Sequence, residues 1–108
     1  MESDPYVVVF ITAPNENSAY EIAELLVEKN IAACVNLIPN VCSIFTWGNE
    51  ATTENEVLLI AKTTARVFRK KLIKTVKSVH PYDVPEIIQL PVTAGYADYL
   101  AWIDRNTA

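Results

Sequence analysis

Apolar residues along the chain recur at two spacings, one typical of strands and the other of helices. The run YVVVFITA (6–13) is continuous and β-branched, which predicts a strand covered on both faces. In residues 18–30, four apolar residues recur at helical spacing opposite a row of glutamates, which predicts an amphipathic helix. We expect Asn15 or Asn17 to cap this helix and Asn30 to end it. The four apolar residues are Ala19, Ile22, Ala23 and Leu26.

The next apolar segment, AACVNLIPNVCSIFTW (32–47), is unusually long for a strand. Fully extended, it would reach about 50 Å, well over twice the length of a typical strand. We expect the Pro39-Asn40 pair to interrupt it as a bulge or bend and Gly48-Asn49 to form a tight hairpin turn. ENEVLLIAKTT (54–64) then returns as the partner strand. Part of this hairpin must project as an arm, and a projecting apolar arm normally pairs with another subunit.

The second half of the chain repeats the same two periodicities. Residues 66–79 predict a helix with outward-facing lysines, which Pro81 stops. EIIQLPV (86–92) predicts a fourth strand, and residues 97–106 predict a short amphipathic helix. The core positions expected of these two helices are Phe68, Leu72, Val76 and Val79 in the first, and Tyr99, Trp102 and Ile103 in the second.

This order of elements predicts an α+β fold. The sequence β-α-β-β-α-β is typical of the ferredoxin-like split βαβ arrangement, an antiparallel four-stranded sheet with both helices on one face. Here an extended β-hairpin arm and a C-terminal helix are added. We expect a single domain over residues 1–108, with an ordered core from about residue 6 to residue 105.

Composition favours self-association and argues against nucleic acid. The 108 residues are 51% apolar, more than so small a domain can readily bury alone. The net charge is −4, yet six of nine basic residues lie between positions 66 and 77. This cluster is either a phosphate-binding helix or one of two solvated helix faces of opposite sign lying side by side, and we favour the second. The acidic counterparts are Glu16, Glu21, Glu24 and Glu28.

The two cysteines, Cys34 and Cys42, form no CxxC pair. On one extended segment they would lie about 25 Å apart, too far for a disulfide or a shared metal ion. Reduced thiols fit a cytoplasmic protein. The start of the chain has no signal-type pattern, and no apolar run approaches the length of a membrane span. We therefore expect a cytoplasmic protein without a membrane partner.

The only histidine opens the motif HPYDVPEI (80–87). Each proline restricts the preceding residue, so His80 and Val84 should be extended and the corner stiff. At a helix C-terminus the dipole favours protonated histidine. His80 can therefore bind a metal, move a proton or pair with Glu86, or it can simply cap the helix while the prolines shape the turn. Both interpretations remain open.

Other polar and aromatic residues in apolar surroundings allow two interpretations as well. Lys62 follows VLLIA on the same side of its strand as Leu58 and Ile60, where it either reaches solvent or anchors an anion. Trp47 and Trp102 are packing anchors or ligand platforms, and Cys34 is a core thiol or a metal ligand.

The sequence contains no glycine-rich phosphate loop, nucleophile elbow or HExxH motif. One histidine and two distant cysteines cannot build a zinc site within one chain, although copper can be held where symmetry multiplies ligands at a subunit interface. We therefore predict no enzyme activity and no obligatory cofactor. Weak acid–base chemistry by Lys62, His80 and Glu86 is the alternative.

Four segments together resemble the CutA divalent-cation tolerance family. They are residues 7–39, SIFTW (43–47), EVLLIAKTT (56–64) and residues 79–103, and they span Tyr6 to Ile103. Within them, AACVN, HPYDVPEI and YLAWI are the most specific. The resemblance implies a ferredoxin-like homotrimer with interlocking arms, similar to the PII signalling trimers.

The resemblance also implies functional positions. In the family, a recurrent set of residues lies around clefts between subunits, and copper binding has been ascribed to cysteine and histidine. The corresponding residues of this chain are Cys34 and His80. Some bacterial members carry cysteines where this chain has Ile11 and Thr75. A basic residue usual at the hairpin tip is also absent, because Gly48, Asn49 and Glu50 follow the tryptophan. The cleft candidates are Trp47, Lys62, His80, Tyr82, Glu86, Tyr99 and Trp102.

We accordingly expect a cytosolic homotrimer of divalent metal tolerance that binds a metal ion, such as copper, or a small anion between subunits without turnover. The alternative is a PII-like signalling or assembly module that binds a partner protein.

Overall fold

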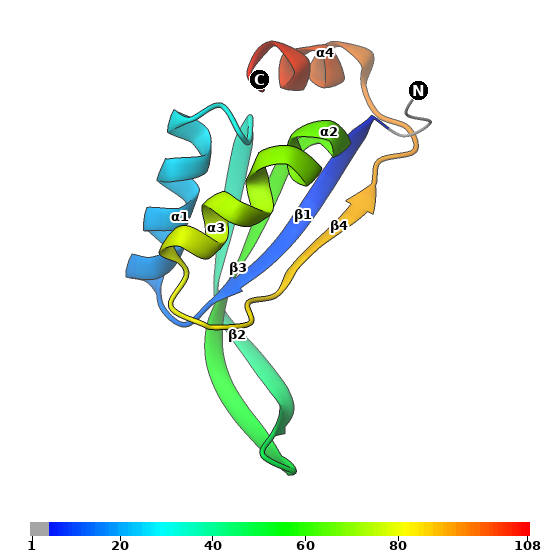
Figure 1. Ribbon diagram of the computed structural model, residues 1–108. Coiled ribbons are helices and arrows are strands. Elements are labelled where there is room, and N and C mark those ends of the chain that lie inside the picture. The colour runs from blue at the N-terminus through cyan, green and yellow to red at the C-terminus, as the bar shows by residue number, and fades with distance from the viewer. Residues whose placement is uncertain (1–4) are drawn as a thin grey trace.

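Four strands form one antiparallel sheet in the order β2-β3-β1-β4 in the computed structural model, which describes residues 5–108 (Figure 1). The central pair is β1 (Tyr6–Ala13) and β3 (Glu50–Thr64), with β2 (Cys34–Trp47) and β4 (Ile87–Pro91) at the edges. This is the predicted ferredoxin-like arrangement. Residues 1–4 of the predicted domain lie outside the described residues.

Two helical segments cover one face of the sheet (Figure 1). The first is α1 (Glu16–Glu28), and the second runs without a break through α2 (Ala65–Val67), η1 (Phe68–Leu72) and α3 (Ile73–Val79). The term helix layer is used below for these two segments. The π-helical turn η1 was not predicted, because its wider winding leaves no mark on the apolar spacing. A fourth helix, α4 (Ala97–Arg105), lies at one end of the sheet.

Local signals at the ends of α1 are confirmed. Asn15, rather than Asn17, caps the helix, because its side-chain oxygen accepts a 2.8 Å hydrogen bond from the Ser18 amide. Asn30 follows the helix at a φ of 58°, a left-handed conformation that asparagine tolerates better than most residues. The four predicted apolar residues of α1 are all buried.

The core lies between the sheet and the helix layer. Alternate residues of β1, namely Val7, Val9 and Ile11, are buried there, together with Leu72 from the helical turn η1. The residues between them are only half-buried. The prediction that β1 is covered on both faces is therefore wrong for the single chain, because both helices pack against the same face.

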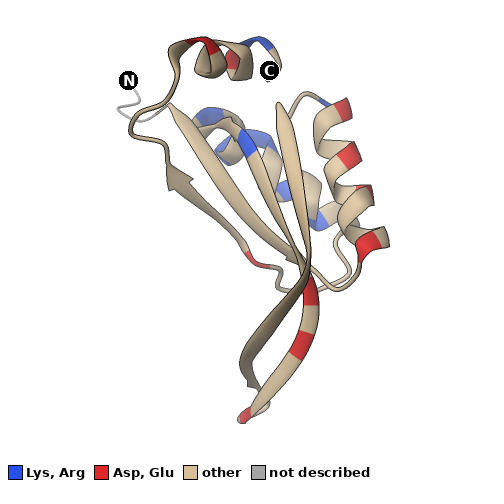
Figure 2. Ribbon diagram, turned by 180° about the vertical axis from the view of Figure 1, so that it is seen from behind, with Lys and Arg blue, Asp and Glu red and all other residues tan. Residues whose placement is uncertain are grey.

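No helix lies in front of the other face of the sheet (Figure 2). This face carries apolar side chains. Cross-strand pairing puts them on one side: Phe10 pairs with both Ile60 and Ile88, and Leu58 pairs with Ile38. We call this surface the open sheet face. Its strongly exposed members are Ile38, Ile88 and Leu90, at 43%, 50% and 40%.

Beyond the sheet, β2 and β3 continue as the predicted arm, residues 41–56. The arm makes the molecule elongated, at 44 × 25 × 23 Å. Gly48 and Asn49 turn its tip with φ values of 58° and 72°, the backbone that favours Asn and Gly in two-residue hairpins. The arm is longer than predicted on its return side, since β3 begins at Glu50 rather than Glu54.

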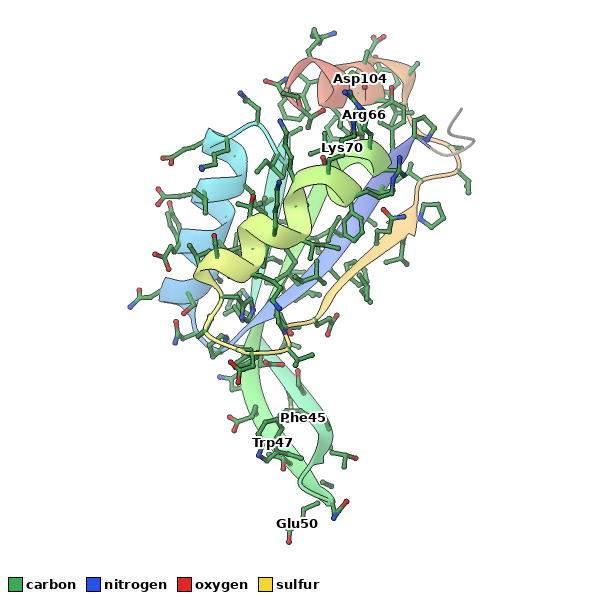
Figure 3. The ribbon with its side chains drawn as sticks, in the orientation of Figure 1. Phe45, Trp47, Glu50, Arg66, Lys70 and Asp104 are labelled. Atoms are coloured by element: carbon green, nitrogen blue, oxygen red, sulfur yellow. The ribbon has the colours of Figure 1, made fainter. Side chains whose placement is uncertain are left out.

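A β-bulge at Pro39-Asn40 separates the arm from the sheet, as predicted. Ile38 pairs with Leu58 but Val41 pairs with Glu56, so two residues of β2 face one residue of β3. Asn40 has a φ of 63°. Because side chains alternate along a strand, the extra residue exchanges the two faces of β2. By this register, Phe45 and Trp47, which Figure 3 labels on the arm, lie on the side that continues the open sheet face.

Candidate functional site

His80 locks the corner between α3 and β4. It has extended backbone and is only 8% exposed. Its Nε2 lies 2.7 Å from the carbonyl oxygen of Thr12, and its Nδ1 accepts a 3.1 Å hydrogen bond from the Tyr82 amide. Because a carbonyl can only accept and an amide can only donate, this geometry makes Nε2 the donor and Nδ1 the acceptor.

Tyr82 extends this corner to a buried carboxylate at the base of the arm. The Tyr82 hydroxyl donates a 2.7 Å hydrogen bond to Oε2 of Glu56, which is 6% exposed. The Tyr82 ring also lies 5.0 Å from the His80 ring between centroids. Burial, followed by the hydrogen bond to Glu56 and the charges of Glu56 and Glu54, raises the pKa of Tyr82 to about 12.

Glu86 shares this acidic environment. Burial, and then the negative charge of Glu56, raise the pKa of the Glu86 carboxyl above its ordinary value. Both effects disfavour the charged form, so an approaching cation would relieve the repulsion between the two acids. His80 and Tyr82 are thus brought together, and Glu56 interacts with both Tyr82 and Glu86.

Glu56 is the residue that sequence reasoning missed. An acid directly before the apolar run VLLIA looks like a strand end exposed to water. Its position two residues from Leu58, however, places it on the open sheet face, and the same alternation that located Lys62 would have found it.

A second group of candidates lies at the opposite end of the sheet. Cys34 pairs across the strands with Lys62, whose Nζ donates a hydrogen bond to Oδ1 of Asn36. On α4, the rings of Tyr99 and Trp102 stack with centroids 5.6 Å apart. Burial, and then the charge of Cys34, raise the pKa of Tyr99, which places Tyr99 beside this cysteine. The group combines one cation, a thiol and an aromatic wall.

Trp47 stands apart from both groups. It pairs with Glu50 at the tip of the arm and is 74% exposed. Glu50, Glu56 and Lys62 are each six residues apart along β3, which corresponds to about 20 Å per interval. The predicted cleft residues therefore form three groups in one subunit, at the tip, the base of the arm and the far end of the sheet, and they do not converge.

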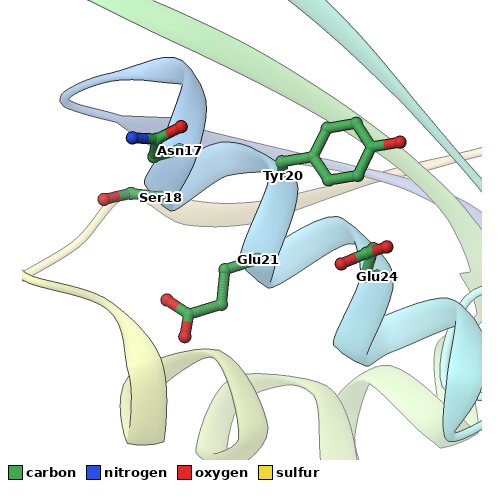
Figure 4. Close-up of a pocket in the computed structure, with 5 residues that line it drawn as sticks. All are labelled: Asn17, Ser18, Tyr20, Glu21 and Glu24. Carbon is green, nitrogen blue, oxygen red and sulfur yellow. The ribbon is translucent and has the colours of Figure 1, made fainter.

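Two hollows in the described part of the chain are not lined by any predicted cleft residue. One, of about 450 Å³, lies on the outer side of α1 (Figure 4). The other, of about 200 Å³, lies at the base of the arm between the β1–α1 turn and the bulge, and Glu56 is one of its walls. Its remaining lining residues are Pro14, Asn15, Glu16, Asn40, Asn55 and Val57.

A metal ion held by Cys34 and His80 of the same subunit does not fit this geometry. Cys34 pairs with Lys62, whereas His80 contacts Thr12, which pairs with Leu58 four residues further along β3. The separation along the strands alone is about 13 Å, while metal–ligand bonds are near 2 Å. Throughout residues 5–108, no three His, Cys, Asp or Glu residues are placed to hold one ion. Both cysteines are free, as predicted.

Fold and site together define a class: a small ferredoxin-like α+β subunit with a projecting hairpin and an uncovered apolar sheet face. The model of the CutA1 divalent ion tolerance protein family matches residues 7–106. The chain belongs to this family.

Named relatives agree with this assignment. The chain is 48% identical over 100 residues to the divalent-cation tolerance protein CutA of Thermus thermophilus, covering 93% of this chain and 96% of that protein. It is 47% identical over 98 residues to mouse protein CutA, covering 91% of this chain but only 55% of the mouse protein. It thus spans about half of the mouse relative.

A solved structure shares the fold closely. The divalent cation tolerance protein of Thermus thermophilus superposes with a TM-score of 0.93 at 47% identity, over 95% of this chain and 99% of that chain. Among residues 5–108, no helix is both long and apolar enough to cross a membrane.

Proposed function

We propose that this chain acts in tolerance to divalent metal ions as a cytoplasmic homotrimer that binds a metal ion or small anion between subunits, without turnover. The observation that carries the proposal is the open sheet face and its continuation into the arm. Ile38, Ile88 and Leu90 on the sheet, with Phe45 and Trp47 on the arm, are between 39% and 74% exposed. An apolar surface of this extent is typical of a protein–protein interface.

Assembly would also bring residues of the three separated groups together, each from a different copy of the chain. The arm tip is far from both other groups of its own subunit, but it can reach a neighbouring subunit. Trp47 would then form one wall of a cleft whose floor belongs to another copy. A cyclic arrangement fits, because an arm and the surface that receives it are different patches of the same chain.

The two remaining groups favour different ligands. At the end of the sheet that holds Lys62 and Cys34, the lysine is a cation with no described carboxylate partner, and it favours a small anion. The thiol of Cys34 favours a soft metal such as copper. The His80 corner can donate to a metal only after one of its two ring hydrogen bonds breaks. Cys34 is therefore the better first ligand, with a donor from another subunit completing the site.

Sedimentation equilibrium at micromolar concentration tests the assembly. The proposal requires three times the chain mass, and a stable folded monomer would overturn it.

Titration of copper(I) and copper(II) tests the ligand. Cys34→Ser should weaken binding, whereas Cys42→Ser, at an exposed cysteine on the arm, is the matched control. His80→Gln can keep an N–H donor toward Thr12 and tests the histidine with less risk to the fold.

The anion is tested separately with inorganic phosphate and the variant Lys62→Gln. If neither copper nor phosphate binds the wild type, the proposed ligand class fails, whatever the mass of the assembly. Cell fractionation tests the compartment, since relatives named chloroplastic in Arabidopsis thaliana and periplasmic in Archaeoglobus fulgidus show that family members differ in this respect.

A second candidate function, a PII-like module that binds a partner protein, is favoured by Ile44. This residue is 71% exposed and lies on the opposite side of the arm from Phe45 and Trp47. An assembly that covers the open sheet face would leave Ile44 uncovered. Metal-independent capture of a reproducible partner that Ile44→Lys abolishes, with the assembly mass unchanged, would favour this function.

A further inference from the structure

The two segments of the helix layer carry charges of opposite sign, acidic on α1 and basic along α2, η1 and α3 (Figure 2). The acidic stripe lies on α1, and the basic ridge runs along α2, η1 and α3. Every residue in both is exposed. The acidic stripe is Glu16, Glu21, Glu24 and Glu28, and the basic ridge is Arg66, Arg69, Lys70, Lys71, Lys74 and Lys77.

The two stripes lie on neighbouring helices but do not neutralise each other through direct contacts. Leaving Arg69 aside, no residue of the ridge forms an ion pair with the acidic stripe within residues 5–108. The sequence-based prediction that the two helices lie side by side is confirmed, since α1 packs against α3. Apart from Arg69, the charged side chains of the ridge and the stripe are exposed to solvent and can meet a partner.

We propose that the helix layer binds the helix layer of a second copy of this chain. A two-fold axis parallel to the helices would place the basic ridge of each copy over the acidic stripe of the other. The pattern is then self-complementary, and the same contact is made twice, as in any isologous interface. Each stripe is then neutralised by the stripe of opposite sign on the second copy, and no other partner is needed.

A second copy fits this surface better than a polyanion does. A phosphate backbone on the ridge would lie beside the acidic stripe and be repelled by it, and the chain as a whole carries a net charge of −4. Apolar side chains are also exposed on the same layer. Tyr20, Val27 and Ile73 are 63%, 43% and 39% exposed, and they supply the kind of contact that a protein surface can use.

This association does not compete with the proposed trimer. The helix layer covers one face of the sheet, whereas the open sheet face is on the other. Two trimers, or two single chains, could therefore join through their helix layers. The inference does not depend on which of the two is the basic unit.

The proposal predicts an unusual dependence of self-association on salt concentration. Two bodies of like net charge repel each other, and lowering the salt strengthens this repulsion. Self-association that becomes stronger at low salt therefore requires patterned charges that face each other. Sedimentation velocity of the full chain should show the basic unit at about 300 mM salt and heavier species at about 20 mM, conditions between which screening changes strongly. Single chains would reach twice their mass, whereas trimers, each with three helix layers, would reach twice their mass or more.

Charge-reversal variants identify the surfaces. Lys70→Glu with Lys74→Glu reverses the ridge, and Glu21→Lys with Glu24→Lys reverses the stripe. Each pair should weaken the low-salt association by about tenfold or more, whereas all four changes together exchange the two signs and should restore it to within about threefold. Arg105→Glu on α4, compared with Lys74→Glu alone, is a control that makes the same change in net charge outside the helix layer.

Circular dichroism of each variant establishes that it is folded. The proposal is overturned if the wild type shows no gain in mass at low salt, or if the four changes together do not restore association. Binding of duplex DNA or anionic vesicles through the ridge, without self-association, would also overturn it and assign the ridge to a polyanion. The mass at high salt reports on the trimer separately, so the two proposals can fail independently.

Discussion

The hydroxyl of Tyr82 donates a 2.7 Å hydrogen bond to the buried carboxylate of Glu56, which joins the corner after α3 to the base of the arm. The two residues are 26 positions apart in the chain. Tyr82 is in turn held by His80 through its backbone amide. Together with the bond from His80 to Thr12, these hydrogen bonds join the corner to β1 and β3, and this gives the first prediction.

Replacing Tyr82 with phenylalanine removes only the hydroxyl. Glu56 then loses its hydrogen-bond donor while it stays buried, so we expect the free energy of unfolding to fall by about 1–3 kcal/mol. Urea denaturation measures this. Tyr20→Phe, at a tyrosine that is 63% exposed, is the matched control and should change stability by less than about 0.5 kcal/mol.

Tyr82 should also titrate unusually late. Its pKa is raised from 10 to about 12, so the folded state keeps the phenol proton at pH values where the unfolded chain has lost it. The stability linked to this group is therefore fully present below pH 10 and is lost as the pH rises toward 12. Tyrosinate absorbance should show a step near pH 12 that Tyr82→Phe removes. Its persistence in the variant would assign the step to another tyrosine.

The turn at the tip of the arm predicts how strongly different substitutions at Gly48 destabilise the arm. An added Cβ would meet no atom within 4 Å, so only the backbone φ of 58° matters. Left-handed backbone costs ordinary residues about 1–2 kcal/mol, and asparagine less. Gly48→Val should therefore destabilise the arm most, Gly48→Ala less and Gly48→Asn least, as measured by amide hydrogen exchange in the arm. Equal effects would show that the turn rearranges.

The helix cap offers a test between two neighbouring asparagines. Asn15→Ala removes the acceptor for the Ser18 amide and should cost about 1 kcal/mol of stability. Asn17→Ala is the control, since Asn17 lies within the first turn of α1 and not at its cap. A larger loss in the control than in Asn15→Ala would contradict the assigned cap.

The open sheet face predicts a substitution that separates folding from assembly. Ile88 is 50% exposed in the single chain, so Ile88→Lys should leave each subunit folded while placing a charge in the proposed interface. We expect the sedimenting mass to fall, since an unpaired buried charge is costly. Val84→Lys, at a loop residue that is 90% exposed, should leave the mass unchanged.

The features predicted correctly from the sequence are those set by local chemistry. Asn15, the Pro39-Asn40 bulge and the Gly48-Asn49 turn each act within a few residues, through a capping oxygen or a left-handed backbone, and all three are confirmed. The order of elements then left few topologies to consider.

The features that were missed depend on contacts between distant parts of the chain. The bond from His80 to Thr12 spans 68 residues and makes Nε2 the donor of the ring. The burial of Glu56 depends on Tyr82 in the same way. The separation of the cleft candidates into three groups follows from strand lengths and register, which no motif encodes, and their convergence stays a prediction about the assembly.

Asn40 gives the arm an orientation that is independent of the rest of the subunit. The bulge inserts one residue into β2 and none into β3, so a chain with one residue added to β3 opposite Asn40 could keep every pair above and below it. Because β3 would then reverse its alternation in the arm, the arm would present Ile44 where Phe45 and Trp47 now lie. A single-codon insertion could thus redirect what the hairpin recognises while the domain beneath it stays intact, which makes this position a simple place for new binding specificities to arise.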